Sequence, residues 1–406
     1  MSYLKDTARG VAWIGLFRIL TRAISFGKTI LLARILSPEQ FGVFGVVALT
    51  LSLLEVFTET GVNTVLIQLK KNATEYINSA WVVSIVRGVV IAIGMVLGSQ
   101  FVGVFFHIPE SASLIALAAA IPFVRGFINP SVVNFQKELL FRKEFVFRTI
   151  IFSVDAFTSI GLTLLLKSPA GLVWGILMGA VFEMLLSHIF LNPKPKLEFK
   201  RENLSYVVHR GKWMTMSGIF DYLIQNGDNI VVGRLLGPGP LGLYQMAYQI
   251  STVPVTEISN ILSKVAFPVF VKMGDDRRLL VKAYAQLVIT IAAVVGMVSL
   301  TLIVLSPQFV QLILGEKWIS IVPVLQILLL FAFVKSVVLS SYAFFLAIER
   351  QELLTLISLV GLFCMAISIV PLISTFGIVG AAYATLIGAL FSMLPMGYYL
   401  YRERTI

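Results

Sequence analysis

The feature that most constrains this chain is a motif that occurs twice, two hundred positions apart. Residues 31–44 read Leu-Leu-Ala-Arg-Ile-Leu-Ser-Pro-Glu-Gln-Phe-Gly-Val-Phe, and residues 231–244 read Val-Val-Gly-Arg-Leu-Leu-Gly-Pro-Gly-Pro-Leu-Gly-Leu-Tyr. An apolar pair, an arginine, a second apolar pair, a proline, a glycine and an aromatic residue recur in the same order. A repeat of such long period in a hydrophobic chain is typical of membrane transporters built from two related halves.

The composition places the chain in a membrane. Hydrophobic residues make up 58% of the 406, and charged residues only 13%, whereas soluble domains carry about 25% charged residues. A membrane-crossing helix needs about 20 mostly apolar residues. The sequence predicts twelve such segments, at about residues 10–34, 41–67, 78–106, 112–135, 146–166, 169–191, 213–235, 240–267, 283–306, 319–347, 353–373 and 376–401.

The basic residues outside these segments predict the orientation. Alternate loops hold 21 Lys and Arg residues, and the other loops hold only Arg34, Lys167, Arg234 and Lys317. Basic loops stay on the cytoplasmic side, so both termini are expected there and the number of spans is expected to be even. The net charge of +11 is therefore interpreted as a topology signal, and no nucleic-acid partner is predicted.

The longest polar stretch, residues 192–212, divides the chain. We predict an all-α membrane protein with an N-terminal six-helix bundle (1–191), a basic cytoplasmic linker (192–212) and a C-terminal six-helix bundle (213–406). Because each half has six spans, the halves are expected to be parallel repeats around a central cavity that forms the substrate path. The sequence has no glycine-rich nucleotide loop and no paired metal-ligand His or Cys, so no cofactor or metal is predicted.

Several predicted spans contain charged residues, which are costly in hydrocarbon and normally face a cavity or a partner. Arg18, Arg22 and Lys28 share one face of the first span at 100° per residue, and Arg87 and Arg125 lie deep in theirs. Converging cations, Arg above all, suit a phosphate-bearing substrate. In the alternative interpretation, Glu55 and Glu59, one turn apart in the second span, neutralise Arg18 and Arg22 of the first span as structural ion pairs. The candidate substrate-binding residues are Arg18, Arg22, Lys28, Arg87, Arg125, Glu55 and Glu59.

A second group of charges lies in the other half. Asn226-Gly227-Asp228 places a carboxylate beside an amide within a span, an arrangement that suits Na⁺ binding or proton transfer. Asp228 is equally suited to hold Lys335 or another helix. The candidate residues for coupling to Na⁺ or H⁺ are Asp221, Asp228, Glu257 and Lys335.

Three stretches resemble a known family. Residues 32–42, residues 236–248 and the segment that contains Gly315-Glu316-Lys317-Trp318 and Pro323-Val324-Leu325-Gln326 are similar to polysaccharide (O-antigen type) flippases. They resemble the colanic-acid and teichuronic-acid exporter branch of the multidrug/oligosaccharidyl-lipid/polysaccharide exporter superfamily. The resemblance covers essentially the whole chain, which has fewer predicted spans than is common in that branch.

The resemblance implies a flippase for an undecaprenyl-diphosphate-linked oligosaccharide, working by alternating access in the bacterial inner membrane. It also implies that Arg18 and Arg22 hold the diphosphate, and that a polysaccharide polymerase and chain-length machinery are partners beside the lipid-linked oligosaccharide and the bilayer.

Other function classes remain as alternatives. A cation-coupled exporter of small molecules shares the architecture, and would favour a cavity of net negative charge. A membrane enzyme such as a glycan polymerase usually carries a large outward loop, whereas the outward loops here are short. A membrane scaffold gives no reason to bury so many charges.

Overall fold

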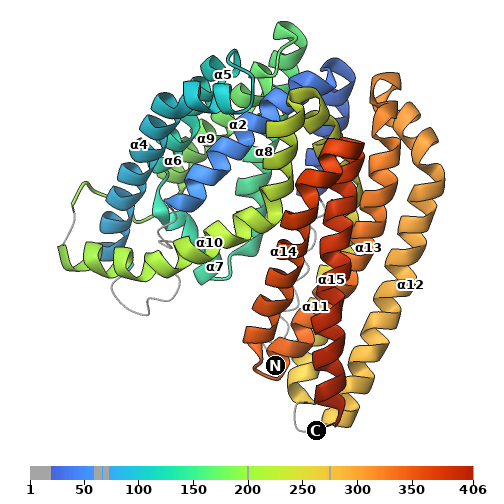
Figure 1. Cartoon of the computed structure of the whole chain (residues 1–406). Coiled ribbons are helices and arrows are strands. Elements are labelled where there is room, and N and C mark those ends of the chain that lie inside the picture. Colours follow the sequence, from blue (N-terminus) through green and yellow to red (C-terminus); the bar gives the residue numbers. More distant parts are fainter. Residues whose placement is uncertain (1–19, 59–65, 67–72, 199–200, 274–275, 406) are drawn as a thin grey trace. The chain divides into compact units, whose positions relative to one another are not determined.

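The computed structural model describes residues 20–58, 66, 73–198, 201–273 and 276–405. The side chains of 73–75, 201–217 and 403–405 lie outside the described set, as do Arg18 and Glu59. Within the described residues the chain is helical and contains no strand (Figure 1). After a helical segment at 20–35 come α2 (Pro38–Phe57), α4 (Ala73–Phe105), α5 (Ser111–Ala118), α6 (Ala120–Gly126), η1 (Pro130–Val133), α7 (Asn134–Lys137), α8 (Phe141–Leu166), α9 (Ala170–Phe190), α10 (Arg201–Leu236), α11 (Pro238–Lys272), α12 (Arg277–Phe309), η2 (Val310–Leu314), η3 (Glu316–Ile321), α13 (Val322–Ala347), α14 (Gln351–Phe376) and α15 (Ile378–Thr405).

Within the described residues, each predicted span overlaps a helix or a bent pair of helices, and residues 10–19, 59–65 and 67 of the first two predicted spans lie outside the described set. Eight helices of the described chain are long and apolar enough to cross a membrane, and a ninth span is added if the bent pair Ser111–Gly126 and Pro130–Lys137 counts as one. The remaining predicted spans correspond to the helical segment at 20–35 and to α10 and α11, in which polar residues dilute the apolar stretch. The all-helical membrane fold is therefore confirmed.

Two predicted segments differ in shape from the structure. Residues 112–135 were predicted as one span, and they bend by 71° between Gly126 and Pro130, where the proline removes a backbone donor and Asn129 caps the next turn. The predicted linker 192–212 is irregular only at its start, because the chain is helical from Arg201 onward as part of α10.

Both copies of the repeated motif form the same element, a tight turn into a new helix that begins with proline. A proline in the first helical position loses no hydrogen bond, because that N–H has no intrahelical acceptor. Before α2, Ser37 and Gln40 form a reciprocal capping box. Before α11, Gly237 adopts φ +85°, a conformation that glycine reaches without a steric penalty. The repeat therefore specifies two helix boundaries through two different local solutions.

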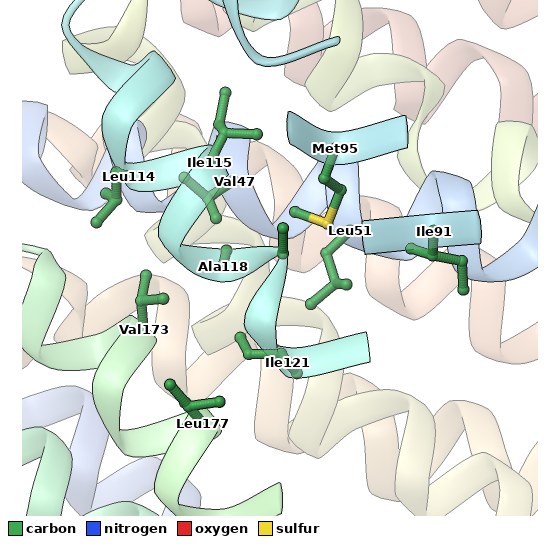
Figure 2. Packing of buried hydrophobic residues seen from close by; sticks show 11 residues of the cluster. Val47, Leu51, Ile91, Met95, Leu114, Ile115, Ala118, Ile121, Val173 and Leu177 are labelled. Atoms are coloured by element: carbon green, nitrogen blue, oxygen red, sulfur yellow. The ribbon is translucent and has the colours of Figure 1, made fainter. Parts of the chain in front are cut away.

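The chain forms two compact units, Met1–Gln225 and Asn226–Ile406, and the boundary lies within α10. In the first unit, apolar side chains of α2, α4, α5, α6 and α9 form one core (Figure 2). Met95 and Ile115 are fully buried there. In the second unit, α13 packs against α11, α12 and α15, and Phe344 and Phe345 near its end are fully buried.

The outer faces of several helices are apolar. Leu97 and Phe101 of α4 are 78% and 73% exposed, and Met297 and Leu300 of α12 are 72% and 64% exposed. Large apolar side chains exposed in rows suit lipid, where no water has to be ordered around them. These faces agree with a chain that crosses a bilayer repeatedly.

Candidate functional site

The first unit contains a polar cleft of about 320 Å³ that is walled by membrane helices. Three arginines and two glutamates reach it from five different helices, so the charged groups of the wall carry one net positive charge. Charged groups on membrane-spanning helices normally face a partner or a cavity that holds water or substrate. The polar residues of the wall are Glu55, Ser84, Arg87, Arg125, Asn129, Gln136, Arg148 and Glu183.

Two glycines bring the arginines of α4 and α6 together. Gly88 follows Arg87, and Gly126 follows Arg125. A Cβ atom at Gly88 would overlap the carbonyl oxygen of Pro122, and one at Gly126 would lie 2.9 Å from the carbonyl oxygen of Ser84. The two backbones therefore touch at this crossing, as small residues permit between membrane helices. The close approach places two guanidinium groups at the same cleft.

Arg87 closes the C-terminal end of α2. Its Nη2 donates to the backbone carbonyl of Glu55 at 2.7 Å, and its Nε donates to Oγ1 of Thr58 at 3.2 Å. The last carbonyls of a helix have no partner within that helix, so a cation at this position satisfies them and complements the helix dipole. The position of Arg87 thus depends on backbone and hydroxyl groups of α2.

Arg125 forms an ion pair with Glu55. Its Nη1 lies 2.7 Å from Oε1 of Glu55, and the side chains are 41% and 29% exposed. The pair therefore lies at the surface of the cleft and is accessible from it. This ion pair fits the structural alternative for Glu55, but its partner is Arg125 of α6, whereas the sequence interpretation paired Glu55 with the first span.

A broken helix forms the floor of the cleft. The wall residues Arg125, Asn129, Pro130 and Gln136 lie on both sides of the 71° bend. Backbone outside a helix is tolerated at membrane depth only where protein buries it or where it lines a wet cavity. Here the break is fixed by hydrogen bonds to the end of α9. The Asn129 N–H donates to Oγ of Ser187, and Oγ of Ser131 donates to the carbonyl of Pro193.

Two charged wall residues were not among the predicted site residues. Arg148 lies in α8, and its Nε donates to Oε1 of Glu144 at 3.0 Å. It was counted among the basic residues of the cytoplasmic loops because it stands at the very start of the predicted span 146–166, whereas α8 begins five residues earlier, at Phe141. Glu183 of α9 lies in a predicted span and makes no hydrogen bond or ion pair within the described part of the chain. The signal for both was the presence of a charge at the edge or inside of an apolar segment.

Lys28 lies apart from the cleft wall. Its Nζ is 2.8 Å from Oδ2 of Asp155 in α8, and the two side chains are only 16% and 17% exposed. Oγ of Ser159 donates to the other oxygen of Asp155. This geometry is that of a sealed ion pair between two helices. Arg22 is exposed on the helical segment at 20–35, and Arg18 and Glu59 are outside the described residues.

The second unit contains a buried polar network centred on Asp228. Only 3% of Asp228 is exposed. Its Oδ2 accepts from the hydroxyl of Tyr244 at 2.8 Å, and its Oδ1 accepts from the backbone and side-chain amides of Asn229. Oδ1 of Asn229 is itself buried without a hydrogen-bond partner among the described atoms. Such an orphaned acceptor beside a carboxylate is uncommon and marks the site as incomplete on its own.

Lys335 lies close to this network. Its Nζ donates to the hydroxyl of Tyr248 at 3.3 Å and lies 5.2 Å from the centre of the Phe331 ring. Its charge interacts electrostatically with Asp228. Glu257 is half-buried in α11, and Asp221 is exposed. Two of the four predicted coupling residues, Asp228 and Lys335, are thus brought together.

A group of three or more His, Cys, Asp or Glu that could hold a metal ion is absent from the described residues. Glu55 of the cleft is held by an arginine, and Asp228 of the second unit is held by tyrosine and amide donors. The guanidinium, amide and hydroxyl groups of the cleft wall can bind charged and hydroxyl-bearing ligands.

The family described as "Polysaccharide biosynthesis protein" matches residues 31–323, more than two thirds of the chain, starting at the first copy of the repeated motif. The chain belongs to this family. The resemblance seen in the sequence is therefore confirmed.

Individual sequence relatives support this family assignment. The chain is 29% identical over 350 residues to the lipopolysaccharide biosynthesis protein WzxC of Escherichia coli (strain K12), covering 83% of this chain and 69% of that protein. It is 23% identical over 373 residues to the teichuronic acid biosynthesis protein TuaB of Bacillus subtilis (strain 168), covering 87% and 73%.

Solved structures show the same fold. The lipid II flippase MurJ in an inward closed conformation superposes with a TM-score of 0.79 at 14% identity, covering 97% of this chain and 89% of that one. An inward-facing multidrug resistance MATE family transporter of the MOP superfamily gives a TM-score of 0.73 at 15% identity, with 98% of each chain covered. This member of the polysaccharide biosynthesis family therefore has the fold of membrane transporters.

Proposed function

We propose that this protein moves a lipid-linked oligosaccharide, carried on a polyprenyl diphosphate, from the cytoplasmic to the outer leaflet of the membrane. The observation that carries the proposal is the cleft at the helix break, where Arg87, Arg125 and Arg148 reach a polar space inside a membrane bundle. Membership of the polysaccharide biosynthesis family supports the substrate class. The activity breaks no bond and consists of binding and movement.

The proposed role of the arginines follows from their chemistry. A guanidinium presents parallel N–H donors that match the oxygens of a phosphate, and it stays charged at every pH of the cell. Arg125 is 41% exposed and offers part of its fork to the cleft. The amide groups of Asn129 and Gln136 and the hydroxyl of Ser84 are suited to sugar hydroxyls. Arg22 and Arg18 remain further candidates for the same headgroup.

The location and orientation are part of the proposal. The relatives are bacterial proteins of polysaccharide biosynthesis, and the arrangement of basic loops supports cytoplasmic termini in the bacterial inner membrane. Alternating access of two six-helix bundles is the proposed mode of transport. A polysaccharide polymerase and chain-length machinery are the proposed partners on the outer side.

We further propose that the Asp228 network is where a coupling ion, Na⁺ or H⁺, binds. The buried carboxylate and the orphaned carbonyl oxygen of Asn229 supply two oxygen ligands of the kind that Na⁺ accepts, and the carboxylate alone suffices for a proton. Asp228→Asn should abolish export but leave substrate binding in the first unit intact. Export that is unchanged in this variant would contradict the coupling role.

The main experiment tests the cleft arginines in cells. In a strain that lacks the gene, the double variant Arg87→Gln with Arg125→Gln should fail to restore surface glycan, and the lipid-linked intermediate should accumulate on the cytoplasmic side. Arg350→Gln, which removes an exposed arginine of the second unit, is the matched control and should restore export. Normal export by the double variant would refute the proposal. Loss of drug efflux with normal glycan export would favour a small-molecule exporter.

A further inference from the structure

Arg125 and Glu55 form an ion pair in the wall of the cleft. This pair indicates a specific role for Glu55. We infer that Glu55 is a built-in competitor, whose carboxylate and the substrate's anionic group compete for the guanidinium of Arg125, so that the cleft accepts anions of charge two or more and rejects monoanions. The inference deepens the proposed function and rests on it, since it concerns how the same cleft selects a diphosphate.

The ion pair is close but accessible. Nη1 of Arg125 and Oε1 of Glu55 are 2.7 Å apart, while 41% and 29% of the side chains remain exposed. Exposed ion pairs contribute little net stability, because water and salt screen the attraction and two side chains lose conformational freedom. An incoming anion therefore displaces the carboxylate at small cost.

The carboxylate nevertheless sets a threshold. Glu55 is tethered beside Arg125, so its effective concentration at the guanidinium is high. A free monoanion carries the same single charge as the Glu55 carboxylate but is not tethered beside Arg125, so it competes poorly for the guanidinium. A diphosphate offers more than one charge and several oxygens, and it reaches the other arginines of the wall at the same time. Net selection for multiply charged anions follows from this difference.

The geometry separates the side chain of Glu55 from the rest of the site. Arg87 is held by the backbone carbonyl of Glu55 and by the hydroxyl of Thr58, and these groups do not change when the carboxylate is altered. Glu55→Gln keeps the size of the side chain and an oxygen that accepts from Arg125. The variant therefore removes one negative charge from the cleft and leaves both arginines in position.

The same competition acts on release. Once the diphosphate begins to leave, the carboxylate of Glu55 is available 2.7 Å from Arg125 and replaces the departing charge. A tight cationic site without such a competitor would hold its substrate too long for transport, because slow release limits turnover. Glu55 thus favours release as well as selection.

The test measures dissociation constants of purified full-length protein at one fixed ionic strength. The probes are inorganic pyrophosphate, geranylgeranyl diphosphate and the monoanion dimethyl phosphate. The proteins are the wild type, Glu55→Gln and the control Glu110→Gln, which removes the same charge from an exposed position outside the cleft wall. Glu55→Gln should bind both diphosphates about tenfold more tightly and should bind dimethyl phosphate measurably. Glu110→Gln should match the wild type, and all three proteins should have equal melting temperatures.

The outcomes separate this inference from the proposed function. The inference would be overturned if Glu55→Gln bound diphosphates no more tightly than the wild type, or more weakly. It would also be overturned if none of the proteins bound pyrophosphate. Tighter diphosphate binding by Glu55→Gln in a protein that exports no glycan in cells would support the competition and contradict the proposed function. A gain with inorganic pyrophosphate alone would support the competition and assign the cleft to a free diphosphate.

Discussion

Two ion pairs in the first unit have almost the same length and very different surroundings. Lys28 and Asp155 are 2.8 Å apart with 16% and 17% of their side chains exposed, and Arg125 and Glu55 are 2.7 Å apart with 41% and 29% exposed. The first pair is sealed between helices and receives a further hydrogen bond from Ser159. The second pair faces a cleft. The two ion pairs therefore differ in role despite their similar distances, because the surroundings of each pair decide whether a ligand can replace one of the partners.

The sealed pair is also tightly packed. A Cβ atom at Gly175 of α9 would overlap Oγ of Ser159 and lie 2.8 Å from Asp155. Both partners are largely buried, and removing one leaves the other charge without compensation, so neither partner is easily replaced by a ligand. The open pair has a polar space beside it, and a substrate anion can enter that space.

The largest effect is expected from breaking the sealed pair. Asp155→Asn leaves the ammonium group of Lys28 buried without its counter-charge, and should lower the free energy of unfolding by about 3 kcal/mol. Thermal unfolding of purified protein in detergent measures this change. The double variant Lys28→Met with Asp155→Leu should recover most of the loss, because an apolar pair needs no counter-charge. A single variant as stable as the wild type would contradict the sealed-pair interpretation.

The next effect comes from separating the helices that carry the open site. Gly88→Ala introduces a methyl group against the carbonyl of Pro122 and 3.1 Å from Cα of Gly126, and should destabilise the protein by about 2 kcal/mol and reduce export. Gly94→Ala on the same helix is the control, since its nearest neighbour is a side-chain atom of Leu54 at 3.8 Å. The control should be neutral or stabilising by up to about 1 kcal/mol. Equal effects at both glycines would argue against the close crossing.

A smaller effect is expected at the open pair. Glu55→Gln, the same kind of amide replacement as Asp155→Asn, should change the free energy of unfolding by less than about 0.5 kcal/mol, because the pair is screened. Unfolding in the same detergent, measured side by side with Asp155→Asn, gives the contrast directly. A loss as large as that of Asp155→Asn would show that the open pair is structural after all.

The smallest effect is expected at an ion pair with no cavity and little burial. Arg350 and Glu352 are 3.3 Å apart with 48% and 61% of their side chains exposed. Arg350→Gln should leave both the melting temperature and export unchanged within error, since such pairs rarely contribute measurable stability. A clear loss of export would mean that this surface takes part in transport.

The helical content and the helix boundaries are largely predictable from local sequence. Long apolar segments predict spans because each backbone group in lipid must be satisfied within its own helix, and the Ser37-Pro38 and Gly237-Pro238 steps specify where α2 and α11 begin. Pro130 favours a bend near Asn129, but local sequence does not give its size. The bend is also held by contacts with Ser187 and Pro193, about sixty positions further along the chain.

The sequence alone determined that the chain is a helical membrane protein of repeated design, and that rare charges lie within its apolar segments. Those properties depend on composition and on spacing along one helix. The tertiary structure alone decided that Lys28 is sealed against Asp155 whereas Arg125 is paired with Glu55 at a cleft. Which charged side chains pair depends on which helices touch. Contacts between glycines that are far apart in the sequence, such as Gly88 and Gly126, help to set these helix contacts, and no local sequence pattern reveals them.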